Sequence, residues 1–259
     1  MSLGPSGGSR SWERNLERMA LSLRAWQRAV GASAAGGAVL EMDQAVASVV
    51  PATPTRSMLN AAAGPRGMPW DRSVVDRLGV AYEEAGIRVW GIWVHEDDAG
   101  GLGDAGLVID SRPAAMALDL SELSAARPAD GVTVEAVRDL SVLAQPLGAG
   151  YGFPPELLTS GLPGLLDHTR GWVAFADGEP AAGLVIVDCD GDAGVFMVAT
   201  APEFRGRGAA SSALYRALLH AREEGSLTST LQSSAMGHSV YARLGYVDLG
   251  AYLLWERRP

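Results

Sequence analysis

The chain has 259 residues, 47% of them hydrophobic and 20% charged, a composition typical of a folded globular protein and not of a disordered or membrane-embedded one. Its formal net charge of −9 argues against a dedicated nucleic-acid binder, whose domain would carry a basic face. The acidic balance favours cationic small partners only weakly. The single cysteine, Cys189, excludes an intramolecular disulfide and a multi-cysteine metal site.

The sequence carries no signal for a membrane or a secretory route. No apolar run approaches the roughly 20 residues that would span a bilayer. The opening residues MSLGPSGGSR lack the apolar core of a secretory signal. We therefore expect a cytoplasmic protein without a membrane partner, in which residues 1–10 form a disordered tail or tag remnant.

The amino-terminal half begins with a helical pattern. Apolar residues from Trp12 to Val30 recur every three or four positions, which predicts an amphipathic helix that ends at Gly31. The later elements predicted in this half are strands at 39–50 (with a break near Asp43) and 56–63, a helix capped by Asp71 and ended by Gly86, and strands at 87–94 and 112–120.

A change of composition divides the chain. Residues 121–131, SELSAARPADG, are small, polar and without periodicity, so we predict a domain boundary there, with one domain at 11–125 and a second at 131–259. The second domain is predicted to have strands at 132–137, 171–176, 181–188, 193–200, 227–233 and 247–256, and helices at 138–149, 154–168, 208–224 and 237–244. Short turns between the strands of 171–200 favour an antiparallel meander.

The run VATAPEFRGRGAASSALYRALL has the features of an anion site. A strand leads through a proline-containing loop into a helix whose first backbone N–H groups have no intrahelical partner. Gly206 and Gly208 let a phosphate approach the backbone, and Arg205 and Arg207 add positive charge. The alternative interpretation is an ordinary strand-to-helix turn with solvated arginines.

Two motifs in the second domain resemble the GNAT superfamily of N-acyltransferases. Arg205 to Ala210 match that family's pyrophosphate signature, Arg/Gln-x-x-Gly-x-Gly/Ala, and AMGHSVYARLGY is similar to its last helix, with Tyr241 in the general-acid position. The resemblance implies an α+β fold with α/β/α layers and a mixed, mainly antiparallel sheet. It also implies two partners. Acetyl-CoA is the cosubstrate that donates the acyl group, and an amine accepts it.

The resemblance assigns roles to individual residues. Tyr241 would donate a proton to the departing thiolate, a plausible transfer between a phenol of pKa about 10 and a thiol of pKa about 8.5. The acyl group would lie where the strand ending at Thr200 diverges from strand 227–233. The cofactor-binding residues implied are Met197, Val198, Ala199, Thr200, Arg205, Gly206, Arg207, Gly208, Ala209, Ala210, Ser211 and Ser234.

Two features depart from the family or stay open. Many members have an asparagine near the end of the fifth strand, where this chain offers Gln232, Ser233 and Ser234. A general base is not identifiable: the conceivable residues are Asp188, Asp190, Glu203 and His238, and each is better interpreted as a turn or surface residue. Deprotonation of the amine through water is the alternative.

The amino-terminal half resembles a degenerate second GNAT-like copy, because it repeats the element order without an R-G-x-G signature before Asp71. It would complete the acceptor pocket or dock against the other half. The dinucleotide-type pattern at 101–106 is discounted because a strand and not a long helix follows it. No metal site is expected from His95, His168, His220 and His238, and Trp70, Trp90 and Trp93 are expected in the core or at the domain interface.

Two functions follow as hypotheses. The first is an acetyl-CoA-dependent N-acyltransferase that acts by direct attack of a small-molecule or protein amine. The second is a non-catalytic acyl-CoA-binding regulatory module, which retention of Tyr241 makes the weaker interpretation. The sequence leaves the acceptor, the length of the acyl chain and a homodimer open.

Overall fold

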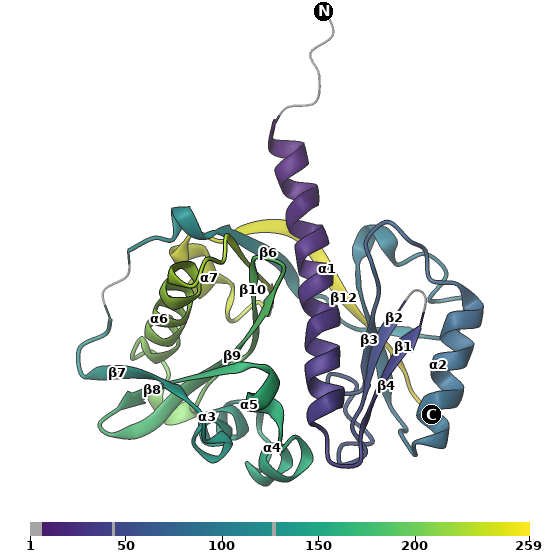
Figure 1. Ribbon diagram of the computed structural model, residues 1–259, viewed down its shortest axis with the longest axis horizontal. Helices are drawn as coiled ribbons and strands as arrows, with labels where there is room; N and C mark the ends of the chain where they lie inside the picture. Colours follow the sequence, from purple (N-terminus) through teal and green to yellow (C-terminus); the bar gives the residue numbers. More distant parts are fainter. Residues whose placement is uncertain (1–6, 43–44, 126–127) are drawn as a thin grey trace, which may run out of the picture.

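A long helix, α1 (Gly7–Ser33), lies between two lobes of the computed structural model, which describes residues 7–42, 45–125 and 128–259 (Figure 1). It packs against strands of both lobes. The buried positions Leu16, Met19, Leu23 and Trp26 confirm the apolar stripe predicted from the sequence. Residues 7–10 were expected in a disordered tail and instead belong to this helix, while residues 1–6 lie outside the described part.

The amino-terminal lobe contains the predicted helix and most of the predicted strands. Its elements are β1 (Ala38–Met42), β2 (Ala45–Val49), β3 (Ala61–Ala63), α2 (Arg72–Glu84), β4 (Trp90–His95) and β5 (Val108–Ser111). Asp71 caps α2 by accepting a hydrogen bond from the backbone N–H of Ser73, and Gly86 follows the helix with a φ of 72°, as expected. The expected break near Asp43 falls on residues outside the described part.

The predicted strand at 56–63 is wrong over most of its length. Turns occupy the residues before β3 because the buried amide of Asn60 binds the surrounding backbone. Its Oδ1 accepts from the Val50 N–H at 2.7 Å, and its Nδ2 donates to the Thr53 carbonyl at 2.8 Å. A side chain that satisfies backbone groups in this way favours a turn over an extended ladder.

The carboxy-terminal lobe follows the predicted order. Its strands are β7 (Val132–Val137), β8 (Arg170–Ala176), β9 (Glu179–Cys189), β10 (Asp192–Thr200), β11 (Thr228–Ser233) and β12 (Val247–Arg257), and its helices are α3 (Leu140–Tyr151), α4 (Glu156–Gly161), α5 (Leu165–His168), α6 (Ala209–Glu223) and α7 (His238–Leu244). Strands β8 to β10 form the predicted antiparallel meander, β7 pairs antiparallel with β8, and β10 pairs with β11 in parallel.

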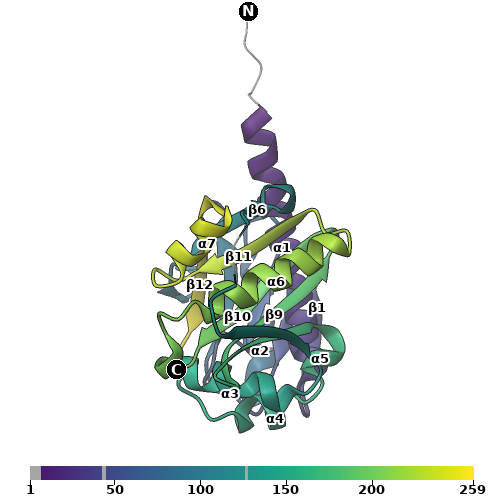
Figure 2. The ribbon, with the colours of Figure 1, turned by 90° about the vertical axis from the view of Figure 1, so that its left-hand side faces the viewer.

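Helices cover both faces of this lobe's sheet. Alternate residues of β9 point to opposite sides: Leu184 and Ile186 contact α6, whereas Val185 and Val187 belong to the cluster that contains α1 and α3. Figure 2 shows α6 lying across the sheet on the side that faces the viewer. The α/β/α layering expected from the sequence is therefore present.

The two lobes exchange their last strands. Strand β6 (Ala114–Asp119), the final strand of the amino-terminal half, pairs with β11 and with the first part of β12. The second part of β12 then crosses to pair with β4 and β5. One sheet of 12 strands results, ordered β1-β2-β3-β4-β12-β6-β11-β10-β9-β8-β7 with β5 on β12. A linear division at residues 125–131 stays a prediction, since each side of it supplies a strand to the other.

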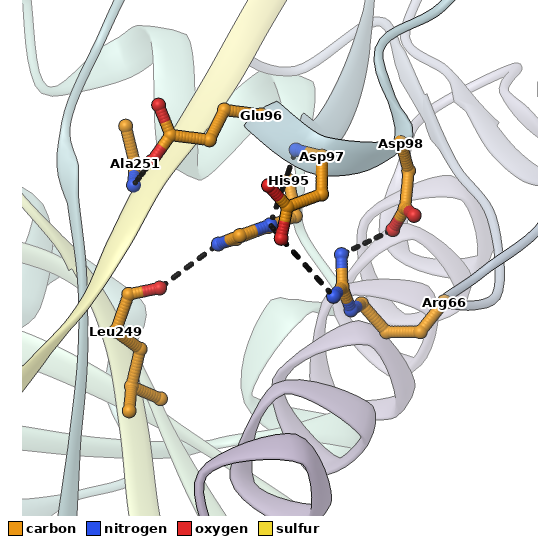
Figure 3. A network of polar contacts seen from close by, with 7 residues as sticks. All are labelled: Arg66, His95, Glu96, Asp97, Asp98, Leu249 and Ala251. Carbon is orange, nitrogen blue, oxygen red and sulfur yellow. Dashed lines mark hydrogen bonds and ion pairs between the residues drawn. The ribbon is translucent and has the colours of Figure 1, made fainter. Parts of the chain in front are cut away.

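Polar contacts hold β12 where it crosses between the lobes (Figure 3). The ring of His95 is buried, and its Nε2 lies 2.8 Å from the carbonyl oxygen of Leu249. Glu96 accepts a hydrogen bond of 2.8 Å from the N–H of Ala251. Between them, Gly250 has a φ of 88°, and a Cβ there would lie 2.7 Å from the Glu96 carboxylate, so this close crossing requires glycine.

Each lobe is built on the same parallel unit. In the carboxy-terminal lobe β10, α6 and β11 form a strand-helix-strand unit, and in the amino-terminal lobe β3, α2 and β4 form another. In both, the next strand in the sheet comes from the other half of the chain. The tandem arrangement and the mixed, mainly antiparallel sheet agree with the sequence prediction.

The remaining sequence features have structural places. Trp70, Trp90 and Trp93 are buried, residues 101–106 form turns before β5, and Cys189 ends β9 as a free thiol. Among the described residues, no group of three or more His, Cys, Asp or Glu side chains could hold a metal ion. None of the helices described is both long and apolar enough to cross a bilayer.

Candidate active site

The centre of the site is an irregularity in β10. Pairing with β9 shifts register between Phe196 and Ala199, and Met197 has a φ of 52°, which is rare for a residue with a side chain. Pairing with β11 ends at Gly194 opposite Thr230. The two parallel strands therefore diverge, as predicted. From residue 195 onward β10 has no strand partner on that side within the described residues.

A cavity of about 480 Å³ opens where the strands diverge. Both halves of the chain contribute to its walls. Its lining residues are Leu23, Trp26, Met58, Trp93, Ser111, Arg112 and Pro113 from the amino-terminal half, and Tyr151, Val195, Phe196, Met197, Val198, Gln232, Ser234, Ala235 and Tyr241 from the carboxy-terminal half. The cavity thus brings together Met197, Val198, Ser234 and Tyr241, four of the residues that the sequence predicted.

Tyr241 reaches this cavity from α7. Its ring packs edge-on against Tyr246 with 5.8 Å between ring centroids, and 7% of its surface is exposed. Burial raises the pKa of its phenol, with a smaller contribution from the neighbouring Tyr151. Among the described residues its hydroxyl group has no hydrogen-bond partner. The group is therefore protonated at neutral pH and free to donate.

Tyr151 lines the same cavity as Tyr241 and was missed in the sequence. Its hydroxyl donates a hydrogen bond of 3.2 Å to the carbonyl oxygen of Val198. Although 40% of the residue is exposed, its surface lines the cavity, and desolvation raises the pKa of Tyr151 to about 12. It ends α3, two residues beyond the predicted helix, in a segment where no motif marks it.

The glycine-rich loop follows the same strand. A short 3-10 helix, η3 (Pro202–Phe204), leads into residues 205–208, where Gly206 and Gly208 have φ values of 77° and 76°. No side chain caps α6. The backbone N–H groups of residues 206–211 donate to no acceptor among the described residues. An anion fits this arrangement because several donors at the positive end of a 15-residue helix are unfilled.

The two arginines of the loop differ in their surroundings. Arg207 forms an exposed ion pair with Asp177, 2.7 Å between Nη2 and Oδ2, and its guanidinium lies 5.4 Å from the centre of the Phe204 ring. Arg205 is exposed and has no ion pair or hydrogen bond from its side chain among the described residues. An anionic ligand would therefore compete with Asp177 for Arg207, whereas it could bind Arg205 without displacing a side chain of the described residues.

The other predicted cofactor residues lie along the same path. Ala199 and Thr200 pair with Gly183 and Ala182 of β9, and residues 209–211 form the first turn of α6. Residues 205–211 are separate from the cavity lining and lie beyond the end of β10. The hydroxyl of Ser234 accepts a hydrogen bond of 3.3 Å from the Gly237 N–H, in the turn before α7.

None of the four conceivable bases lines the cavity. Asp188 pairs with Arg170, Asp190 occupies a turn with a φ of 49°, and Glu203 lies in η3. The Nε2 of His238 is 2.8 Å from an Asp248 carboxylate oxygen in an exposed pair. The structure thus gives each of them the turn or surface position that the sequence analysis favoured.

A second cavity of about 280 Å³ adjoins the first, with which it shares Met58, Tyr151 and Met197. Its walls come from the loop at 55–59 and from the segment around Phe153. Arg56 spans these parts, with its guanidinium 5.6 Å from the centre of the Phe153 ring. The amino-terminal half therefore closes one side of both cavities.

The amino-terminal lobe lacks a comparable anion site at its own helix. The carboxylate of Asp71 caps the start of α2 and accepts the N–H of Ser73 at 2.6 Å. A negative side chain in this position repels a phosphate and fills one of the donors that would bind it. The lobe thus keeps the strand-helix-strand unit without its phosphate-binding end, as expected of a degenerate copy.

Comparisons with known proteins agree with this geometry. Residues 137–246 match the model of the acetyltransferase (GNAT) family. A GCN5-related N-acetyltransferase from Kribbella flavida superposes with a TM-score of 0.67 at 21% identity, over 94% of this chain and 95% of the other. A GCN5-related N-acetyltransferase-like protein from Streptococcus suis gives 0.56 at 15% identity, over 96% and 99%.

A tandem GNAT protein from the clavulanic acid biosynthesis pathway has the same kind of double fold, with a TM-score of 0.55 at 14% identity over 82% of this chain and 78% of the other. Identities this low show the shared fold alone. A comparison with curated proteins gives no match. The family match, the glycine-rich loop and the divergence of β10 from β11 lead to one conclusion: residues 137–246 form a domain of the acetyltransferase (GNAT) family.

Proposed function

We propose that the protein is an acetyl-CoA-dependent N-acyltransferase that acts by direct attack of an amine, with Tyr241 as the general acid. The observation that carries the proposal is that an unpartnered, protonated tyrosine and the open edge of β10 face one cavity. The same strand leads into the unfilled amide donors at the start of α6. A cofactor extended along β10 would therefore reach both ends of the site.

The residues present fit acetyl-CoA. The pyrophosphate would be held by the backbone N–H groups of residues 206–211 and by Arg205 and Arg207. The pantetheine arm would pair with the open edge of β10 near Val198, whose carbonyl now accepts from Tyr151. When bound, acetyl-CoA supplies an activated acetyl thioester.

Tyr241 holds the proton that the reaction needs. Its hydroxyl would donate to the thiolate as the thioester bond breaks, while the amine nitrogen bonds to the acyl carbon. The raised pKa makes this transfer more uphill than between the free groups, but it keeps the phenol protonated throughout the neutral range. Tyr241 therefore acts as an acid and not as a base.

The amine must arrive neutral. No carboxylate lines the cavity among the described residues, and its walls are largely apolar. Desolvation in such surroundings lowers the pKa of an ammonium group and favours the neutral amine. Proton loss to water before or during entry is thus the simplest route, and no protein base is required.

Calorimetric titration of acetyl-CoA followed by measurement of thiol release tests the proposal. We expect saturable binding, and release with at least some amines of a panel. The double variant Arg205→Glu/Arg207→Glu should weaken binding by about tenfold or more, because two favourable contacts with phosphate become repulsive. The control Arg77→Glu reverses one charge on an exposed position of α2, distant from the loop, and should leave affinity unchanged.

The outcomes separate the two functional hypotheses. Binding without release for any amine would favour a non-catalytic acyl-CoA-binding module. Affinity unaltered in the double variant would contradict the phosphate site at residues 205–211. Absence of binding would overturn the assignment of acetyl-CoA as the cosubstrate.

A further inference from the structure

The charges around the two cavities are unexpected for this acidic chain. Among the described residues, the charged side chains that line them are Arg112 in the larger and Arg56 in the smaller, and neither cavity has an Asp or Glu in its lining. The whole chain carries a net charge of −9. An acceptor with several ammonium groups would lose its hydration there without gaining a carboxylate partner. The cavities therefore disfavour polycationic acceptors.

Arg112 is an exposed residue in the wall of the larger cavity. It lies in the two-residue connection between β5 and β6, and Ala114, the first residue of β6, pairs with Ser233 at the end of β11. This register puts Arg112 near the end of β11, past Thr230 where the pairing with β10 stops, and Arg112 lines the cavity together with Gln232 and Ser234. Its side chain is exposed and has no hydrogen bond or ion pair within the described chain. A guanidinium with its N–H donors unfilled is suited to bind a carboxylate in bidentate geometry.

Most of the other lining residues from the amino-terminal half form an apolar surface together with Phe196. Trp26 of α1 stacks on Phe196 of β10 with 4.8 Å between ring centroids and an angle of 6° between planes. Trp93, Met58 and Leu23 extend this surface. All but Phe196 come from the amino-terminal half, so that half determines which apolar groups fit. A flat or branched apolar group would be buried here.

We propose that the acceptor is a small amine that also carries a carboxylate and an apolar body, as apolar α-amino acids do. Arg112 binds the carboxylate, and the surface formed by Trp26, Phe196 and Trp93 takes the apolar body. The inference rests on the proposed transferase function and adds the substrate class to it. It makes Arg112 a specificity-determining residue that is not involved in the acyl transfer itself.

Matched acceptors test the role of the carboxylate. Thiol release from acetyl-CoA is measured with phenylalanine, phenylalaninamide, 2-phenylethylamine and spermidine. Calculated on the concentration of the neutral amine, kcat/KM for phenylalanine should exceed that for phenylalaninamide by about tenfold, the effect of one charge-assisted contact. The amine of the amide is the less basic of the two, so a preference for the acid cannot come from a larger neutral fraction.

Variants of Arg112 connect this preference to the residue. Arg112→Gln should lower kcat/KM for phenylalanine about tenfold and leave that for phenylalaninamide unchanged, and Arg112→Lys should recover part of the loss. Calorimetry should show unchanged affinity of Arg112→Gln for acetyl-CoA. Arg77→Gln, which removes an exposed arginine from α2, serves as the charge-matched control with wild-type selectivity.

The results distinguish failure of this inference from failure of the transferase function. Release that is equal for the acid and its amide, or highest for spermidine, would overturn the substrate class while supporting the enzyme. Equal losses for acid and amide in Arg112→Gln would also overturn it. If no acceptor gives release, the transferase function fails. The role of Arg112 is then tested by measuring melting temperatures in the presence of acetyl-CoA. A rise in melting temperature on adding phenylalanine that is lost in Arg112→Gln would support carboxylate binding by Arg112. No rise in the wild type would contradict it.

Discussion

At the residue scale, the environment of Tyr241 decides what its phenol can do. Tyr241 lines the cavity, its hydroxyl has no hydrogen-bond partner in the part of the chain that the structure describes, and burial raises its pKa above the ordinary value near 10. The position of the residue in its motif indicated an acid. The direction of the pKa shift comes from burial of the phenol and, to a smaller extent, from the nearby Tyr151, neither of which the motif reveals.

Substitution of Tyr241 by Phe should lower kcat by about 10²-fold, because general-acid assistance is lost, and should leave acetyl-CoA affinity intact. Under the proposed mechanism, wild-type activity depends on the protonated phenol and would fall only as pH rises through the raised pKa. We therefore expect no alkaline decline attributable to Tyr241 below about pH 10. Profiles of kcat against pH for both proteins check this. A decline of kcat near pH 8 that is absent from Tyr241→Phe would show that the pKa of Tyr241 is lowered instead.

The two loop glycines offer a matched pair for backbone strain. Both have positive φ, but a Cβ at Gly206 would meet nothing within 4 Å, whereas a Cβ at Gly208 would lie 2.9 Å from the Ala129 Cβ. Gly206→Ala should cost about 1 kcal/mol of unfolding free energy from the backbone alone. Gly208→Ala should cost about 1 kcal/mol more because α6 and Ala129 must separate. Urea unfolding measures both, and equal losses would contradict the predicted contact.

At the scale of elements, a buried carboxylate joins α1 to the strands beneath the site. Asp192, which is 0% exposed, accepts hydrogen bonds from Ser22 of α1 at 2.7 Å and from Thr228 and Thr230 of β11 at 2.8 and 2.6 Å. The sequence analysis had placed Asp192 in a turn between strands. Its pairing with Cys189 and Thr228 instead makes it the first residue of β10.

Asp192→Ala should lower the free energy of unfolding by about 2–4 kcal/mol, because three buried hydroxyls lose their acceptor. Desolvation raises the pKa of this carboxyl in the folded state. A raised pKa means that the contribution is fully present below the unfolded value near 3.9 and is lost as pH rises through the folded-state pKa. The deficit should thus be larger at about pH 4 than at about pH 7. The control Thr228→Val, which removes one hydrogen-bond donor, should cost about 1 kcal/mol of unfolding free energy at either pH. A deficit of Asp192→Ala that grows as pH rises would contradict the raised pKa of Asp192.

At the scale of the whole molecule, the exchanged strands should make the lobes unfold together. β6 and β12 each complete a sheet to which the other half contributes. Leu78 of α2 and Leu214 of α6 are both 0% exposed and belong to the cores of different lobes. Replacing either with Ala should cost about 2–5 kcal/mol and should lower the midpoint of the same single transition. Calorimetry that resolves two transitions, with each variant shifting only one, would show independent domains.

The sequence by itself determined the local elements and the chemistry of the motifs. The periodicity of α1, the cap of α2 and the run from β10 into α6 follow from spacing, capping residues and glycines, which act within a few residues of the chain. These features were predictable because their causes are local. The role expected for Tyr241 came instead from the resemblance of its motif to the last helix of the GNAT family.

Only the tertiary structure decided which segments meet. The sequence predicts strands at β6 and β12, but a strand's hydrophobic pattern does not specify its partner, so their exchange between halves was hidden. Tyr151 and Arg112 carry no motif and reach the cavity through the packing of α3 and through the register of β6. The residues proposed to hold the pyrophosphate and the pantetheine arm therefore lie in one continuous segment. The residues proposed to bind the acceptor come from distant segments, because burial brings together apolar surfaces wherever they lie along the chain.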